Sequence, residues 1–281
     1  MQQHSSLVRE MRRSDLPQVQ KLIKKDPISH AFLANRLTEM QYEPFNTLNE
    51  IYVYEVDSII ESALYHGANT IPIETNSQSQ AAFAETLHDV QRRSASLVGP
   101  VSEVLGLWKL LKPRWGIARD IRANQPVLNI DQAPLLAPDP LVRRAFAREI
   151  DLLLPACVSM FTEEVGISPV SGGGLNAYRM RIAELISSGR SLVRIDRGEV
   201  VFKAEIGVVS ESVCQVQGVW VPPQYRGRGY AKAGMAAVVN YARLNLAPNV
   251  SLYVNDYNER ARAIYKKVGF VQHSTFATVL F

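Results

Sequence analysis

The segment of this chain best suited to chemistry is a glycine-rich turn flanked by basic residues. Residues 224–231 read Gln-Tyr-Arg-Gly-Arg-Gly-Tyr-Ala, after a predicted apolar strand at 218–221 and before a predicted helix. Gly227 and Gly229 let the main chain bend with no Cβ in the way, so that successive N–H groups can point at one anion. The helix adds unpaired N–H donors and the positive end of its dipole at the same place. Cationic side chains surround the turn at Arg226, Arg228 and Lys232, and together these features predict a site for a pyrophosphate.

Two better-known phosphate motifs do not match this turn. A P-loop requires a lysine and then a serine or threonine after its last glycine, but Gly234 is followed by Met235 and Ala236. A dinucleotide fingerprint requires glycine or alanine at its sixth position, which here is Lys232. The pattern that remains is Gln/Arg-x-x-Gly-x-Gly/Ala, which is met by Gln224, Gly227 and Gly229.

This loop pattern resembles the acetyl-CoA loop of the GNAT superfamily of N-acetyltransferases. In that family the loop leads into a helix, a strand, an Asn-x-x-Ala-x-x-x-Tyr helix and a Gly-Phe step. The sequence predicts a helix over 231–246 and a strand over 250–254. The later positions match in order at Asn258, Ala261, Tyr265, Gly269 and Phe270. The resemblance covers roughly the last eighty residues. Agreement at so many positions in the same order is not expected by chance.

The resemblance implies a fold class and a cofactor site. The fold is α/β (α+β), with a mixed, mostly antiparallel sheet flanked by helices in the C-terminal half. The co-substrate is acetyl-CoA, and no metal is involved. By the family's pattern, the residues that bind the coenzyme are Val219, Trp220, Val221, Gln224, Tyr225, Arg226, Gly227, Arg228, Gly229, Tyr230, Ala231, Asn255, Asn258, Ala261 and Tyr265.

The same resemblance implies the reaction. In the family an amine attacks the thioester directly, and the tyrosine of the Asn-x-x-Ala-x-x-x-Tyr helix, here Tyr265, protonates the sulfur. Backbone N–H groups of the strand before the loop, matched by residues 219–221, stabilise the charge that develops on the thioester oxygen. We therefore expect an acetyl-CoA-dependent N-acetyltransferase that acts on a primary amine of a small molecule or peptide. The alternative is a non-catalytic, CoA-binding regulatory or partner-binding module.

The general base is where this sequence departs from the family. Gln215 falls where many members carry a glutamate, and an amide cannot accept a proton. Several candidates stay open: Glu205 on the preceding strand, Glu163 or Glu164, a water chain, or the terminal carboxylate of Phe281. Catalysis by proximity alone also stays open, because alignment of two reactants can supply several kcal/mol.

The acceptor site is implied only by the family's architecture. Its early helices wall the acceptor pocket, which places Glu163, Glu164 and Tyr178 near the substrate. Solvation at the surface is the rival interpretation for both glutamates. Residues 171–174, which read Ser-Gly-Gly-Gly, are either a mobile loop over this site or a plain connector.

The motif residues of the last helix also have a structural interpretation. Ala261, Ile264, Tyr265 and Val268 recur at the spacing of the buried stripe of any amphipathic helix. On that pattern alone Tyr265 is a core residue. Asn258 is a good N-cap, a role that is compatible with ligand binding.

A shift in composition divides the chain. Four prolines fall within fifteen residues, at Pro126, Pro134, Pro138 and Pro140, and only four of the 16 glycines precede the last of them. Residues 132–140, which contain three of these prolines, are poor material for a helix or a central strand. We predict an N-terminal α/β domain at 1–131, a linker at 132–140 and a catalytic domain at 141–281.

The N-terminal half repeats the order of elements of the second half. Its predicted elements are a helix at 15–23, a hairpin at 51–56 and 59–66, a helix at 80–87, a strand at 94–98 and a helix at 101–111. We interpret this half as a degenerate, GNAT-like copy in which Gly99-Pro100 takes the place of the phosphate loop. An unrelated α/β cap is the alternative.

Composition argues against several other classes of function. The formal charge of +4, from 31 Lys+Arg and 27 Asp+Glu, gives little support to nucleic-acid binding. Cys157 and Cys214 have no disulfide or CxxC spacing, and the five histidines have no metal-site spacing. A basic start and the lack of a long apolar stretch predict a cytoplasmic protein without a signal peptide or membrane association. The sequence does not reveal the oligomeric state.

Overall fold

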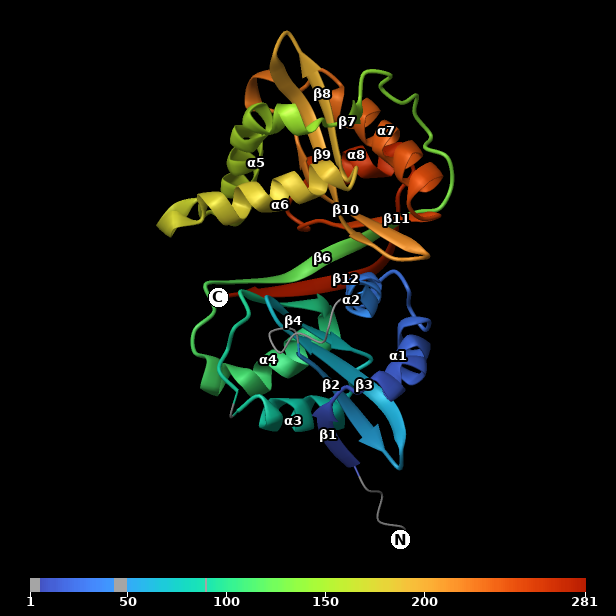
Figure 1. The fold of residues 1–281 in the computed structure, drawn as a ribbon, viewed down its shortest axis with the longest axis vertical. Coiled ribbons are helices and arrows are strands. Elements are labelled where there is room, and N and C mark those ends of the chain that lie inside the picture. Colours follow the sequence, from blue (N-terminus) through green and yellow to red (C-terminus); the bar gives the residue numbers. More distant parts are fainter. Residues whose placement is uncertain (1–5, 43–49, 89) are drawn as a thin grey trace. The chain divides into compact units, whose positions relative to one another are not determined.

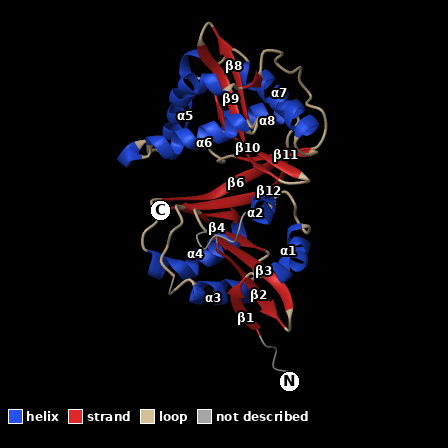
Figure 2. Ribbon diagram, in the orientation of Figure 1, coloured by secondary structure: helices blue, strands red, loops and turns tan. Residues whose placement is uncertain are grey.

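The chain folds into two compact units. The computed structural model describes residues 6–42, 50–88 and 90–281. Unit 1 comprises Met1–Val127, Tyr253–Tyr257 and Gln272–Phe281, and unit 2 comprises Leu128–Leu252 and Asn258–Val271. Each unit is a mixed α/β structure with a mostly antiparallel sheet flanked by helices (Figures 1 and 2), which confirms the predicted fold class.

Unit 1 contains most of the first half of the chain and the last strand. Its helices are α1 (Leu16–Ile23), α2 (Ala31–Tyr42), α3 (Ser77–Thr86) and α4 (Val101–Trp115). Its strands are β1 (Ser6–Glu10), β2 (Glu50–Val56), β3 (Ile59–His66), β4 (Asn69–Ile73), β5 (Ser96–Pro100) and β12 (Val271–Leu280), paired in the order β1-β2-β3-β4-β5-β12. The pairing is antiparallel except between β4 and β5. Strand β6 (Asp120–Ile130) contributes residues to both units.

Unit 2 repeats this arrangement. Its helices are α5 (Ile150–Val165), α6 (Leu175–Ser187), α7 (Tyr230–Asn245) and α8 (Glu259–Val268). Its strands are β7 (Arg143–Arg144), β8 (Ser191–Asp196), β9 (Glu199–Val209), β10 (Val213–Trp220) and β11 (Asn249–Tyr253), paired in the order β7-β8-β9-β10-β11. Only β10 and β11 are parallel. Both units therefore run strand, two helices, three strands, helix, strand, helix, as the predicted internal copy requires.

The division into units differs from the boundaries predicted from the sequence at three segments: residues 128–131 lie in unit 2, and residues 253–257 and 272–281 lie in unit 1. Residues 272–281 were grouped with the catalytic domain, but β12 pairs with β5 and belongs to unit 1. A linear boundary cannot capture this, because strand pairing brings together segments far apart in the chain. The predicted linker is anchored on unit 2, where the N–H groups of Leu135 and Asp139 donate to the carbonyls of Val268 and Ala233.

The structure also corrects the predicted counterpart of the phosphate loop in unit 1. In both units the parallel pair identifies the strand before that loop, and in unit 1 this strand is β4, not β5. The equivalent turn is therefore residues 74–76, and Gly99-Pro100 lies at the end of β5 instead. The sequence prediction followed the glycine, whereas the topology is set by the parallel pairing.

Side chains of unit 1 accept hydrogen bonds from most of the N–H groups at the turn 74–76. The Asn76 side chain accepts hydrogen bonds from the N–H groups of Gln78 and Ser79, at 2.9 and 3.0 Å. The Glu103 carboxylate, from α4, accepts from the N–H and the hydroxyl of Thr75, at 2.8 and 2.9 Å. Side chains of the protein thus occupy the place where a ligand anion would accept these bonds.

Helix α7 shows how closely the elements of unit 2 pack. Its buried stripe includes Met235, Val238, Val239 and Ala242, as the 3.6-residue period predicts. A Cβ at Gly234 would lie 2.7 Å from the ring of Phe202 on β9. Glycine at this position lets the helix approach the sheet, and this packing fixes the turn that begins α7.

Phe281 completes the aromatic part of the unit 1 core. Its ring centroid lies 5.5 Å from that of Trp108 and 5.4 Å from that of Trp115, and the Arg92 guanidinium lies 4.3 Å above its face. Its N–H donates to the carbonyl of Ala95 at 3.1 Å. The residue is thereby fixed on α4 by packing.

We expect Phe281→Ala to lower the free energy of unfolding of unit 1 by about 2 kcal/mol, half of the loss typical for a fully buried phenylalanine. Urea unfolding followed by tryptophan fluorescence, in a Trp220→Phe background, reports on Trp108 and Trp115 alone. Phe146→Ala is the control, because Phe146 is 46% exposed and is stacked by Arg143 and Arg148. An equal loss in both variants would contradict a packing role for Phe281.

Candidate functional site

The site begins where β10 separates from β11. The two strands pair only from Val213 with Asn249 to Gln215 with Ser251, although β10 continues to Trp220. The register of β10 against β9 also shifts between Gln217 and Trp220, where Gly218 has a φ of 59°. This bulge leaves Gly218 and Val219 without a partner in either ladder.

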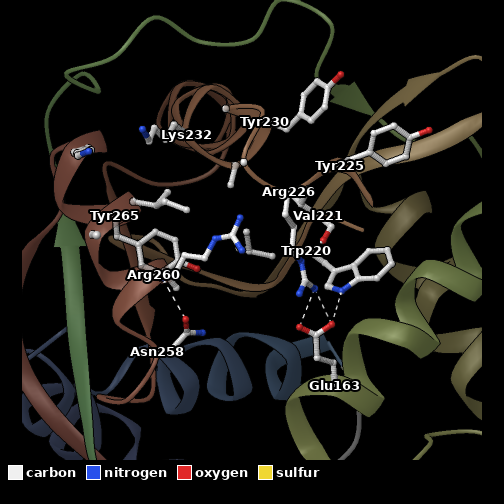
Figure 3. A pocket seen from close by; sticks show the side chains of 18 residues that line it. Glu163, Trp220, Val221, Tyr225, Arg226, Tyr230, Lys232, Asn258, Arg260 and Tyr265 are labelled. Atoms are coloured by element: carbon white, nitrogen blue, oxygen red, sulfur yellow. Dashed lines mark hydrogen bonds and ion pairs between the residues drawn. The ribbon is translucent and has the colours of Figure 1, made fainter. Parts of the chain in front are cut away.

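A pocket of about 550 Å³ lies at this point in unit 2 (Figure 3). Its wall comes from the end of α5, the end of β10, the turn before α7 and one face of α8. The lining residues are Glu163, Val219, Trp220, Val221, Tyr225, Arg226, Gly227, Gly229, Tyr230, Ala231, Lys232, Asn258, Arg260, Ala261, Ala263, Ile264, Tyr265 and Lys267.

The turn before α7 presents a row of unused backbone donors. Gly227 and Gly229 have φ values of 82° and 88°, which strain any residue with a side chain. Gly229 is the N-cap of α7 and supplies no side-chain cap. Within the described part of the chain, the N–H groups of residues 227–231 donate to no acceptor. Five consecutive donors at a helix N-terminus form an anion site.

The charges around the pocket are mostly positive. Lys232, Arg260 and Lys267 line it, and none of them forms an ion pair with a carboxylate of the described residues. Arg226 is already engaged, because its Nε donates to the carbonyl of Val221 at 3.0 Å and its Nη2 contacts Glu163. The three unpaired cations and the row of N–H groups therefore favour an anionic ligand.

Tyr265 is the tyrosine that the sequence analysis predicts as the proton donor to the sulfur. The side chain is 7% exposed, it lines the pocket, and its ring packs on that of Phe270 with centroids 5.8 Å apart. Among the described residues no group forms a hydrogen bond with the hydroxyl. Burial, with a smaller contribution from the charge of Glu164, raises the pKa of Tyr265 above its usual value. The hydroxyl therefore carries its proton at neutral pH and can donate it.

Asn258 occupies the N-cap of α8, as the structural interpretation predicted. Its Oδ1 accepts from the N–H of Ala261 at 3.2 Å, and both residues line the pocket. The cap and the pocket wall are thus formed by one side chain.

Glu163 faces the pocket from the end of α5. Its carboxylate accepts two hydrogen bonds from Nη2 of Arg226, at 2.8 and 2.7 Å, and one from Nε1 of Trp220 at 3.3 Å (Figure 3). The Arg226 bond is the main reason why the pKa of Glu163 lies below its usual value. Glu164 does not line the pocket, but its charge acts on Tyr265.

Three further residues predicted near the reaction do not line the pocket. The Tyr178 hydroxyl donates to the carbonyl of Cys157 at 3.1 Å, between α6 and α5. Glu205 is buried on β9, where it pairs with Lys203 at 2.6 Å. Phe281 packs in unit 1, as described above. Of the residues predicted as proton donor or candidate base, the pocket is therefore lined by Tyr265 and Glu163.

Most of the residues predicted to bind the coenzyme line the pocket, and three do not. Gln224 and Arg228 lie in the same turn, with the Arg228 guanidinium 5.4 Å from the ring centre of Tyr225. Asn255 belongs to unit 1, and its Oδ1 accepts from Nε2 of Gln125 at 2.9 Å. The side chains of Arg228 and Asn255 thus contact Tyr225 and Gln125 instead of lining the pocket.

The sequence analysis missed four lining residues on α8, which are Arg260, Ala263, Ile264 and Lys267. Their spacing of three, four and seven residues contained the signal, because such positions share one helix face. The prediction for α8 used the apolar stripe through Tyr265. It did not include the adjacent cationic residues Arg260 and Lys267.

The described residues contain no group of three or more His, Cys, Asp or Glu side chains placed to hold a metal ion. Across the same ranges, no helix combines the length and apolar character needed to cross a bilayer.

Comparison with known proteins supports the relationship at two levels. Residues 49–153 match a family described as Domain of unknown function (DUF4081), and residues 171–270 match the Acetyltransferase (GNAT) family. A search of curated proteins finds no match to the chain.

Solved structures resemble the whole chain. An acetyltransferase of the GNAT family from Colwellia psychrerythraea is 12% identical, with a TM-score of 0.59 over 98% of this chain and 99% of that one. A GCN5-related N-acetyltransferase from Sphaerobacter thermophilus is 16% identical, with a TM-score of 0.60 over 98% and 95%. A tandem GNAT protein from the clavulanic acid biosynthesis pathway is 11% identical, with a TM-score of 0.55 over 99% and 98%. At these identities the likeness shows the fold, which is that of two GNAT-like domains in tandem.

The loop pattern, the order of elements and the match over residues 171–270 agree. They relate residues 171–270 of the chain to the Acetyltransferase (GNAT) family.

Proposed function

We propose that this protein is an acetyl-CoA-dependent N-acetyltransferase whose pocket in unit 2 binds the coenzyme and whose acceptor is a primary amine. The observation that carries the proposal is the row of five unused N–H groups at residues 227–231, in a pocket that also holds the protonated hydroxyl of Tyr265. The first feature suits a diphosphate, and the second suits protonation of a leaving thiolate.

The residues of the pocket fit coenzyme A as a ligand. The turn at 227–231 would hold the diphosphate, and Lys232, Arg260 and Lys267 would neutralise its charge. The unpaired edge of β10 at residues 219–221 would hold the pantetheine arm. The coenzyme supplies an activated acetyl group as a thioester.

Tyr265 is the proton donor of the proposed reaction. Its pKa is raised by burial, so that the hydroxyl remains protonated, and no other hydrogen bond competes for the proton. Donation to the sulfur would let coenzyme A leave as a thiol when the C–S bond breaks, and the tyrosinate would regain a proton from solvent, which receives the proton of the amine.

The pocket does not offer a free carboxylate as a base. Glu163 is held by Arg226, which lowers its pKa and makes it a weak proton acceptor. The acceptor amine therefore reacts as its free base and loses its proton to water, while the pocket contributes alignment of the two reactants.

A non-catalytic CoA-binding module is the second candidate. Two observations favour it: Gln215 replaces the usual carboxylate, and Glu205 is locked in a buried ion pair. Release of CoA from acetyl-CoA in the presence of an amine panel, corrected for hydrolysis, separates the two. A module of this kind would bind CoA and release none.

Gly229→Glu is expected to raise the dissociation constant for CoA more than tenfold, a loss of about 1.4 kcal/mol or more. The new carboxylate lies beside the N–H row and repels the diphosphate, and the positive φ adds strain. Isothermal titration calorimetry measures the effect. Gly198→Glu is the matched control, because Gly198 has a φ of 81°, open space around a Cβ and no place in the pocket wall. Unchanged CoA affinity in Gly229→Glu would refute the assignment of the turn.

Tyr265→Phe is expected to lower kcat about 10²- to 10⁴-fold, the range for loss of a positioned acid, with CoA affinity unchanged. Tyr257→Phe serves as the control, since Tyr257 is 69% exposed and lies outside the pocket wall. Because the pKa of Tyr265 is raised, the activity of the unaltered chain should show no loss from its ionisation up to about pH 10. Turnover of Tyr265→Phe at the rate of the unaltered chain would exclude it as the acid.

The chain is expected to bind one CoA, not two. At the turn of unit 1, the N–H groups of Thr75, Asn76, Gln78 and Ser79 already donate to side chains of the protein, so this turn has no row of adjacent unused donors for a diphosphate. Calorimetry should give a stoichiometry of one for the unaltered chain and no remaining site in Gly229→Glu. A second site, or a site that survives in that variant, would show that unit 1 binds the coenzyme.

A further inference from the structure

A buried ion pair lies beside the bulge of β10 and has no role in the reaction described so far. Lys203 and Glu205 are two residues apart on β9, so their side chains leave the same face of the sheet. The Nζ of Lys203 lies 2.6 Å from Oε1 of Glu205, and the side chains are 0% and 5% exposed. Neither residue lines the pocket.

This pair is a poor device for stability alone. Removing two charges from water costs several kcal/mol per ion, and apolar replacements of similar size are often neutral or stabilising. Burial pulls the pKa of Lys203 down, but the charge of Glu205 and other contacts outweigh it, so the pKa is raised and the ammonium persists. A charged lysine in this position therefore suggests a geometric task.

That task is visible in the contacts of the pair with Gly218. The Lys203 ammonium donates to the Gly218 carbonyl at 3.0 Å. The Glu205 carboxylate packs against the same residue, because a Cβ built on Gly218 would lie 2.6 Å from its Oε2. The pair thus holds the bulge at its carbonyl and at its Cα, and the φ of 59° at Gly218 makes glycine the residue that fits.

Holding this carbonyl also orients the next N–H group. The peptide bond between Gly218 and Val219 is planar and trans, so its C=O and N–H point in opposite directions. With the carbonyl directed at Lys203, the N–H of Val219 is directed away from it. Val219 lines the pocket and has no partner in either ladder.

A further contact ties the pair to helix α5. The Cys157 thiol donates to Oε1 of Glu205 at 3.3 Å, and burial raises the pKa of this thiol to about 12, which keeps its proton in place. Helix α5 ends near Glu163, which lines the same pocket. The ion pair is therefore fixed from the helix side as well as from the strand.

We propose that Lys203, held by Glu205, is a positioning residue that grips the Gly218 carbonyl and thereby aims the Val219 N–H at the oxygen of the bound thioester. This inference rests on the proposed acetyltransferase function. It assigns to the buried pair the pre-organisation of the donor that stabilises developing negative charge.

The test is the double variant Lys203→Met/Glu205→Leu, which removes both charges together and leaves no buried ion unpaired. We expect its Tm and its affinity for CoA to stay near those of the unaltered chain, because the turn at 227–231 is untouched. We expect kcat, measured with the best acceptor of the amine panel, to fall about 10²-fold or more, as on loss of one oxyanion donor.

An infrared measurement tests the same point without turnover. The carbonyl stretch of bound acetyl-CoA labelled with ¹³C at the thioester carbon should lie lower than in water, since a hydrogen bond to the oxygen weakens the C=O bond. In the double variant the band should return toward its position in water. A role limited to stability would leave the band of the bound thioester unchanged.

Arg179→Met/Asp151→Leu is the matched control, because it replaces a surface ion pair between α6 and α5 that lies 2.6 Å apart and outside the pocket. It should keep both kcat and the infrared band. If Lys203→Met/Glu205→Leu does not fold, Lys203→Met/Glu205→Gln retains an acceptor for Cys157 and must show the same changes.

The outcomes separate this inference from the function on which it rests. A folded double variant with normal kcat and an unshifted band overturns the positioning role and leaves the acetyltransferase intact. No CoA binding, or no turnover of any amine by the unaltered chain, overturns the proposed function, and the positioning role falls with it.

Discussion

The need of every backbone N–H for an acceptor is the constraint on which this structure depends. The turn after β4 in unit 1 and the equivalent turn before α7 in unit 2 meet this need in different ways. In unit 1, side chains of Asn76, Ser79 and Glu103 accept bonds from four N–H groups at the turn, so no row of adjacent donors is left. In unit 2, glycines replace such side chains, and the donors of residues 227–231 stay open within the described chain. The same topology thus yields a turn bonded mostly by side chains in one unit and a turn with five adjacent unused donors among the described residues in the other.

The bulge of β10 applies the same constraint to the proposed reaction centre. Separation from β11 and the register shift against β9 release the main chain of Gly218 and Val219 from both ladders. The freed carbonyl is taken by Lys203, which leaves the Val219 N–H for a substrate. The buried face of the sheet beside α5 can hold these two charges because Lys203 and Glu205 neutralise each other and Cys157 donates to Glu205. In this view the coenzyme loop binds and the bulge orients, and the two tasks use separate groups.

Features formed by residues close in the sequence could be predicted from the sequence. Contacts between segments far apart in the chain could not. The glycine spacing at 227–229 and the N-cap at Asn258 lie within single turns, so their roles could be predicted from neighbouring residues. The pairing of β12 with β5, which takes Phe281 into unit 1, depends on two segments far apart. Glu205 was a candidate base because its partner was unknown. Lys203, two residues before Glu205, is a charged residue within the apolar strand β9. This pattern could have indicated a buried ion pair.

The charge of Lys203 also bears on the missing base. If Glu205 accepted a proton from the acceptor amine, Lys203 would be left as a buried cation without its counter-ion, which is a costly state. Glu163 has the related problem at the surface, since protonation would break its bonds to Arg226 and Trp220. Glu205 and Glu163 are therefore both committed to holding another group in place. In the proposed reaction the carboxylates fix geometry, and solvent takes the proton of the amine.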